Sequence, residues 1–201
     1  YTQGAESRSC EDMLSIRYFV NRPDDFWAFY KSVMLYPKAE PNRAHYALAR
    51  LEKQGKLKAV VTQNIDGLHQ KAGSKNVLEL HGTVLQNTCL QCGKRYGLDY
   101  VLAREGTPHC ECGGTLRPDI VLYGEPLNDR VMDAAIRAVM DCDLLIVGGT
   151  SLVVYPAAGL LGYRRGAKLA LINRDETPFD NRADLVIRES IAQVLDDAIP
   201  R

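Results

Sequence analysis

The chain has 201 residues, 46% of them hydrophobic, and its 25 basic residues balance its 25 acidic residues. This length suits one domain, or one domain with a small satellite. The balanced charge argues against direct binding of nucleic acid or of an anionic membrane. No apolar run approaches the ~20 residues of a bilayer-spanning helix, so we expect no membrane partner. Six cysteines without a secretory signal favour a reducing compartment, and we expect a cytoplasmic protein.

Residues 1–23 are mixed and polar, and they show only weak periodicity. Asp24-Asp25 then opens a helix that Pro37 stops, and a second helix begins after Asn42 and ends at Gly55. Further helices are predicted from Asn128, near Pro156 and over 190–198. Apolar stretches predict strands at 57–62, 77–80, 120–123, 144–147, 169–172 and 185–187. Strands that alternate with helices predict an α/β fold with a doubly wound, parallel, Rossmann-like sheet.

Four cysteines form two close pairs, Cys89-X2-Cys92 and Cys110-X-Cys112, which seventeen residues separate. Each pair can bring two thiolates from one tight turn to one metal ion, and together they supply the S4 shell of a structural zinc. Such a site has no open coordination position, so the zinc is not expected to do chemistry. The alternatives are two disulfides or a redox pair. This module, at 83–118, interrupts the strand and helix alternation and predicts a separate lobe.

Polar clusters follow several of the predicted strands, where parallel sheets bind ligands. His81 ends one strand, and its alternative roles are a general base, a buried structural histidine or a further metal ligand. A Gly-Gly-Thr-Ser turn follows the strand at 144–147, although any such turn favours small residues. The residues of the other clusters could also be ordinary turns or helix caps: Gln63, Asn64, Ile65, Asp66, Asn173, Arg174 and Asp175.

These motifs together resemble the sirtuin family of bacterial type, which are NAD-dependent protein lysine deacylases. The resemblance is carried, over roughly 42–191, by TQNIDGLHQKAG, LELHG, the four cysteines, RPDIVLYGE, GGTSLVVYPAA and INRDETPFD. It implies a Rossmann-like NAD-binding domain at 42–82 and 119–201. A small lobe would comprise a helical part at 1–41 and the zinc module at 83–118.

The resemblance also implies roles for single residues. His81 would be the general base, and Val121, Tyr123 and Val154 would line the acyl-lysine tunnel. The nicotinamide end of NAD would meet Gln63, Asn64, Ile65 and Asp66. The rest of the cofactor would meet a set of residues towards the C-terminus: Gly149, Thr150, Ser151, Asn173, Arg174, Asp175 and Ile191.

The implied reaction removes acetyl or other short acyl groups from lysine and yields nicotinamide and O-acyl-ADP-ribose. An extended substrate peptide would pair with the main chain. Succinyl groups are not expected, because no tyrosine of this chain has an arginine three residues on, the pair that serves desuccinylases of the family. Two alternatives are a protein mono-ADP-ribosyltransferase of the same family and a zinc-ribbon module that binds nucleic acid.

One departure from the family pattern is clear. The Gly-Ala-Gly-Ile-Ser loop and the Pro-Asp-Phe-Arg segment with which the family opens are not among these 201 residues. Since that loop would contact the pyrophosphate, we expect these residues alone to bind NAD weakly and to be a poor enzyme.

Overall fold

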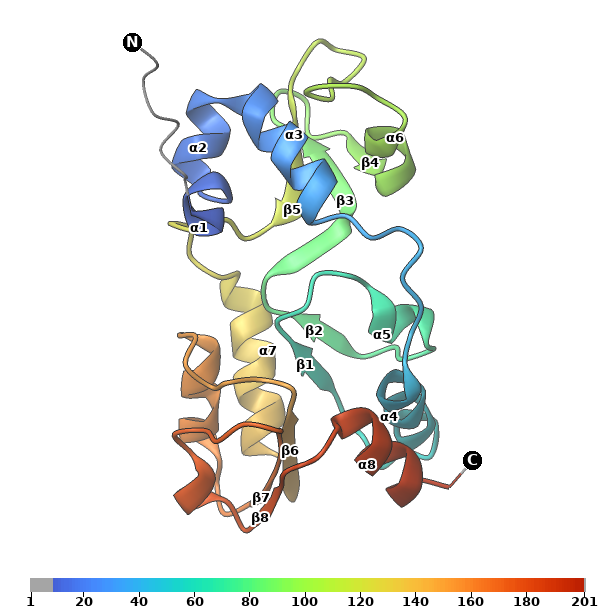
Figure 1. Ribbon diagram of the computed structural model, residues 1–201, viewed down its shortest axis with the longest axis vertical. Helices are drawn as coiled ribbons and strands as arrows, with labels where there is room; N and C mark the ends of the chain where they lie inside the picture. Colours follow the sequence, from blue (N-terminus) through green and yellow to red (C-terminus); the bar gives the residue numbers. More distant parts are fainter. Residues whose placement is uncertain (1–8, 201) are drawn as a thin grey trace, which may run out of the picture. The chain divides into compact units, whose positions relative to one another are not determined.

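The computed structural model describes residues 9–200 of the chain (Figure 1). The chain forms two compact units, each built from two separate segments. Unit 1 comprises residues 1–38 and 81–127, and unit 2 comprises 39–80 and 128–201. Residues 119–127 thus fall in unit 1, whereas the sequence-based division places them with the NAD-binding domain. That division of the protein into domains stays a prediction.

From residue 9 onward, unit 1 contains four short helices and an antiparallel sheet with strand order β4-β3-β5. Its buried centre is aromatic. Phe26 packs edge-on against Phe19 and Trp27 and stacks on Tyr30, with ring centroids 5.0 to 5.8 Å apart. The elements are α1 (Cys10–Met13), α2 (Ile16–Asn21), α3 (Pro23–Val33), β3 (Gly82–Cys89), β4 (Arg95–Gly97), α6 (Leu98–Leu102) and β5 (Leu116–Ile120).

Helices α1 and α2 lie where the sequence shows only weak periodicity. Each begins at a serine, because the side chains of Ser9 and Ser15 accept hydrogen bonds from the backbone N–H groups of Asp12 and Tyr18. Four and six residues are too few to display a helical repeat, so only the serine caps marked these helices in the sequence.

Unit 2 contains two sets of parallel strands, β1-β2 and β6-β7-β8, with helices between them (Figure 1). These strands confirm the parallel α/β class that the alternation predicts. The elements are α4 (Arg43–Lys53), β1 (Val60–Thr62), α5 (Leu68–Lys71), β2 (Val77–Glu79), α7 (Asp129–Met140), β6 (Leu144–Gly148), the 3-10 helix η1 (Ala157–Tyr163), β7 (Lys168–Ile172), the 3-10 helix η2 (Asp180–Arg182), β8 (Leu185–Ile187) and α8 (Ile191–Ala198).

Aliphatic side chains fill unit 2. One cluster joins Ala44 and Ala47 of α4 to Ile172 of β7 and to Leu195 and Ile199 at α8. A second cluster gathers Leu152, Leu169 and Leu171. Within residues 9–200, no helix is both long and apolar enough to span a bilayer.

The strand predicted at 120–123 is wrong in position and in partner. The chain instead forms β5 over Leu116–Ile120, which pairs antiparallel with β3 in unit 1. Beyond it, Tyr123 makes one isolated parallel bridge to Ser15. Periodicity identified an apolar stretch correctly, but it could not tell which sheet the stretch would join, because the pattern of one strand does not identify its partner strand.

Candidate functional site

The four paired cysteines of unit 1 converge in space. Their sulfur atoms all lie within 4.8 Å of one another. Cys89 Sγ lies 3.6 Å from Cys112 Sγ, and Cys92 Sγ lies 3.5 Å from Cys110 Sγ. A tetrahedral zinc with Zn–S bonds of ~2.3 Å would hold its sulfurs about 3.8 Å apart. The donor set therefore fits zinc, whereas a disulfide needs ~2.05 Å, and all six cysteines are free.

Two tight turns present these thiols. Gly93 donates its backbone N–H to the carbonyl of Cys89, and Gly113 does the same to Cys110. Both glycines have positive φ angles, 71° and 86°, which only glycine adopts without strain. At Gly114, a Cβ atom would lie 2.7 Å from Cys89 Sγ. Close packing under the metal position therefore requires glycine there.

Hydrogen-bond donors lie next to two of the sulfurs, those of Cys89 and Cys110, and favour their thiolates, which are the form that binds metal. The backbone N–H of Cys92 lies 3.5 Å from Cys89 Sγ, and it lowers the pKa of that thiol. The backbone N–H of Cys112 and the Tyr96 hydroxyl, 3.0 Å from Cys110 Sγ, lower the pKa of Cys110 to about 6. Tyr96 thus contacts a sulfur of the cluster through its hydroxyl group. The sequence did not indicate this contact, because no spacing rule marks the tyrosine.

His81 is the first residue of the second segment of unit 1 and lies directly before β3. Its backbone carbonyl accepts a hydrogen bond of 2.9 Å from the N–H of Val121. The next residue, Gly82, has a φ of 76°, and a Cβ there would lie 2.1 Å from the carbonyl oxygen of Asp119. Only glycine allows β3 to approach β5 so closely beside the imidazole.

The residues expected to meet the acyl-lysine are partly or largely exposed. In unit 1, Val121 is half-buried next to His81, and Tyr123 is exposed. The backbone of Tyr123 is fixed, because its N–H donates to Leu14 and its carbonyl accepts from Ile16. In unit 2, Val154 is exposed.

A pocket of about 260 Å³ opens at the carboxyl ends of the strands in unit 2. Five of the predicted cofactor residues line it, whereas Thr150, Ser151 and the four predicted residues at 63–66 do not. Three further residues line it that the sequence did not single out: Ile172, Glu189 and Ser190. The predicted residues in its wall are Gly149, Asn173, Arg174, Asp175 and Ile191.

The wall of this pocket is tightly packed at Gly148. A Cβ at that position would lie 2.3 Å from Cδ1 of Ile191 and 2.9 Å from the carbonyl oxygen of Ile172. The neighbouring Gly149 has a φ of 64° and donates its N–H to Ile172 at 3.2 Å. Gly148 therefore fits into the narrow space between Ile172 of β7 and Ile191 of α8, and Gly149 allows the chain to turn there.

The segment Gln63–Asp66 follows β1 in unit 2 and also leads into a helix. Asn64 donates its backbone N–H to the Thr62 hydroxyl at 3.0 Å, and Asp66 accepts from the N–H of Leu68 at 2.9 Å. Asp66 thus accepts a hydrogen bond from the first residue of α5, while Gly67 occupies the N-cap position. This turn is the structural alternative for Asp66, and it leaves the second carboxylate oxygen available for another role.

Two histidines lie next to this segment in unit 2. The rings of His45 and His69 have centroids 4.6 Å apart. Burial lowers the pKa of both imidazoles, and the proximity of His45 lowers that of His69 further, while Asp66 opposes both shifts. Burial also raises the pKa of Glu79. Titratable groups therefore cluster around Asp66, although the sequence pointed only to Asp66 itself.

Comparison with known proteins identifies the class to which these features belong. The Sir2 family matches residues 2–156. An NAD-dependent protein deacetylase of Clostridium acetobutylicum is 56% identical over 94% of this chain and 78% of its own length. A Sir2 structure with p53 peptide and NAD+ has a TM-score of 0.87 at 40% identity, and covers 98% of this chain and 83% of its own.

A second solved structure, Sir2Tm bound to a propionylated peptide, also has a TM-score of 0.87 at 40% identity, over 96% of this chain and 84% of its own. The chain therefore belongs to the Sir2 family, the sirtuins. The resemblance that its motifs predicted is confirmed.

Proposed function

We propose that the chain catalyses NAD-dependent removal of acetyl and other short acyl groups from protein lysine, yielding nicotinamide and O-acyl-ADP-ribose. The pocket of unit 2 carries this proposal, because its glycine turn and polar strand ends suit a nucleotide. Support comes from the relative at 56% identity, which is an NAD-dependent protein deacetylase. The related structures with NAD+ and with a propionylated peptide support both halves of the reaction.

NAD would supply the ADP-ribosyl group that receives the acyl group as nicotinamide leaves. We assign Gly149, Asn173, Arg174, Asp175 and Ile191 to its adenosine half, since they line the pocket. Thr150 and Ser151, on the turn that follows β6, belong to the same assignment by motif. Gln63, Asn64, Ile65 and Asp66 are assigned to the nicotinamide end.

His81 is proposed to accept a proton from a ribose hydroxyl. An imidazole suits this role because its ordinary pKa of ~6.5 lies near neutral pH. Gly82, which follows His81 directly, lies close against the backbone of Asp119 and so restrains the main chain next to His81. Acyl-lysine contacts are assigned to Val121 and Tyr123 in unit 1 and to Val154 in unit 2. The zinc, held by four thiols, would stabilise unit 1 without taking part in the reaction.

We further propose that the protein works in the cytoplasm. Its six free thiols suit a reducing compartment. Its partners would be acyl-lysine proteins or peptides.

His81→Ala provides the test of the proposed function. The purified protein, in a form that also carries the Gly-Ala-Gly-Ile-Ser loop of the family, is incubated with an acetyl-lysine peptide and NAD. Mass spectrometry follows free lysine and O-acetyl-ADP-ribose. We expect a loss of deacetylation of at least about a hundredfold, as for a general base. His109→Ala is the matched control, because it removes the other, exposed imidazole of unit 1 and should leave turnover unchanged.

Product analysis separates the alternatives. A protein that transfers ADP-ribose to another protein would increase the mass of the acceptor without freeing lysine. Parent protein with neither product, or His81→Ala with turnover within a few-fold of the parent, would contradict the proposal.

A further inference from the structure

Helix α8 forms part of the nucleotide pocket through its first residues. Ser190 and Ile191 line the pocket, and Ile191 is packed so tightly that no Cβ fits at Gly148 beneath it. A small shift of α8 along or around its axis would therefore move this part of the wall. Whatever fixes the register of α8 also fixes the shape of the pocket.

Apolar packing holds α8 in place. Leu195 and Ile199 bury their side chains in one cluster with Ala44 and Ala47 of α4 and Ile172 of β7, and Leu48 and Leu51 pack against it. Hydrophobic contact is non-directional. A hydrogen-bonded contact therefore adds a directional restraint that the apolar cluster does not supply.

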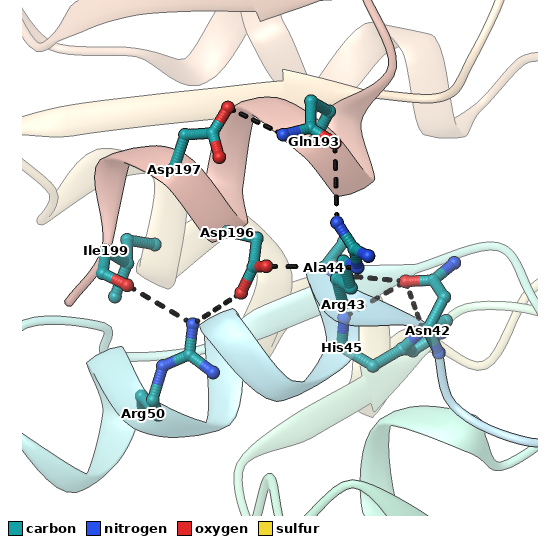
Figure 2. Close-up of polar contacts among 9 residues, drawn as sticks. All are labelled: Asn42, Arg43, Ala44, His45, Arg50, Gln193, Asp196, Asp197 and Ile199. Carbon is teal, nitrogen blue, oxygen red and sulfur yellow. Dashed lines mark hydrogen bonds and ion pairs between the residues drawn. The ribbon is translucent and has the colours of Figure 1, made fainter. Parts of the chain in front are cut away.

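Directional contacts lie at the edge of this packing (Figure 2). One nitrogen of Arg50, Nη2, donates to Asp196 Oδ1 at 3.2 Å and to the carbonyl oxygen of Ile199 at 3.2 Å. The Asp196 side chain is only 10% exposed. Arg50 thus contacts α8 both at a side chain and at its C-terminal end, which restrains rotation and translation together.

Arg43 makes a weaker contact from the same helix. Its Nε lies 3.9 Å from Asp196 Oδ2, and its Nη1 lies 3.5 Å from Gln193 Oε1. Its side chain is 63% exposed, so solvent screens this pair. Arg43 and Arg50 lie seven residues apart and hence on one face of α4 (Figure 2).

We infer that Arg50 and Asp196 are positioning residues for the nucleotide pocket, because their ion pair fixes the register of α8 and so the place of Ser190 and Ile191. This inference rests on the proposed function for the identity of the ligand. Buried ion pairs often add little net stability compared with apolar residues, but they can specify one packing arrangement. The pair would therefore affect cofactor affinity more than it affects folding.

Arg50→Met tests the inference, since it keeps the hydrocarbon stem and removes both hydrogen bonds. Calorimetry with ADP-ribose as the probe should show Kd raised on the order of tenfold. KM for NAD should rise similarly, while kcat at saturating NAD and KM for the peptide stay within about twofold. Partial unfolding would instead lower kcat and leave KM for NAD unchanged. Arg43→Met is the matched control and should leave Kd within about twofold.

A double variant separates positioning from stability. Arg50→Met combined with Asp196→Leu replaces the ion pair by apolar side chains and should restore the melting temperature. ADP-ribose affinity should stay low, because the apolar pair sets no register. Arg50→Lys, which keeps the charge, should recover part of the affinity.

Three results would overturn the inference: parent-like ADP-ribose affinity in Arg50→Met, recovery of affinity together with stability in the double variant, or a parent protein that does not bind ADP-ribose. Failure of the proposed function looks different. In that case the parent binds ADP-ribose but frees no lysine from an acetylated peptide, and the calorimetric comparison of the variants still decides the role of the ion pair.

Discussion

The two units of the protein are stabilised in different ways. Unit 1 has a three-stranded sheet and one aromatic cluster, and four thiols hold its two cysteine turns together. Unit 2 has parallel strands with two aliphatic clusters, and it contains no cysteine from that thiol group. A small lobe buries less surface with which to stabilise its loops, and a metal bound by the four thiols would add to its stability. The larger unit supplies enough packing and leaves its strand ends available for a ligand.

Removal of the metal should have the largest effect, and it should affect unit 1 much more than unit 2. Structural zinc contributes about 10–16 kcal/mol of binding free energy in small domains, so Cys92→Ser should lose the metal and unfold the cysteine turns of unit 1. Metal analysis of the parent should give one zinc per chain, and hydrogen exchange should rise in 82–118 and much less in β6–β8. Cys142→Ser is the control, because Cys142 lies in unit 2 outside the thiol group. A full metal content in Cys92→Ser would refute the site.

A cavity made in unit 2 should destabilise that unit and leave the zinc site of unit 1 intact. Leu171 is 1% exposed within the cluster that includes Leu152 and Leu169. Leu171→Ala should lower the free energy of unfolding by about 2–5 kcal/mol, since it removes buried methyl groups and leaves a void. The zinc content should stay at one equivalent. Denaturant unfolding with metal analysis measures both, and loss of zinc in this variant would show that the two units do not depend on separate interactions.

Crowding at the pocket should have a smaller effect on stability. Gly148→Ala places a methyl group against Ile191 and the backbone of Ile172, and should cost about 1–3 kcal/mol. The same clash should weaken NAD binding, because Ile191 lines the pocket. Gly162→Ala, where a Cβ meets no atom within 4 Å, is the matched control. Equal NAD affinity in the two variants, measured by calorimetry, would argue against this packing.

Acidification should lower the stability of unit 2, and this is the smallest of the expected effects. Burial holds the pKa of His45 and His69 below the ~6.5 of an exposed imidazole. The unfolded chain then binds more protons below that pH, so stability is full above it and falls as pH decreases through the folded pKa values. Glu79, whose pKa is raised by burial, acts in the opposite sense, because the folded state then binds more protons than the unfolded chain.

The melting temperature between pH 8 and pH 5 measures this loss. His69→Leu should reduce the pH dependence, whereas His109→Leu, at an exposed position, should not. An unchanged slope in His69→Leu would mean that the buried imidazoles do not cause it.

The sequence predicted the parts of the site that local chemistry determines. Cysteine spacing predicted the four-thiol group, and polar residues after apolar strands predicted part of the pocket wall, including Asn173. Ile191 was implied only by the resemblance to the sirtuin family. Local signals suffice there because each motif forms within one turn.

Contacts between distant segments could not be predicted in this way. Tyr96 reaches Cys110, Glu189 reaches the pocket, and His45 reaches His69 only after the chain has folded. The partner of β5 was wrong for the same reason, since pairing depends on which strand is available and not on the pattern of the strand itself.

The contact between α4 and α8 also affects how the protein is made. Arg50 and Asp196 are 146 residues apart in the chain, and a ribosome releases residues in order from the N-terminus. The apolar face of α4 is therefore synthesised long before Leu195 and Ile199, the residues with which it packs. Closing so long a loop is slow. A nascent chain is thus expected to expose this face to chaperones until α8 emerges, and stalled chains should aggregate through it.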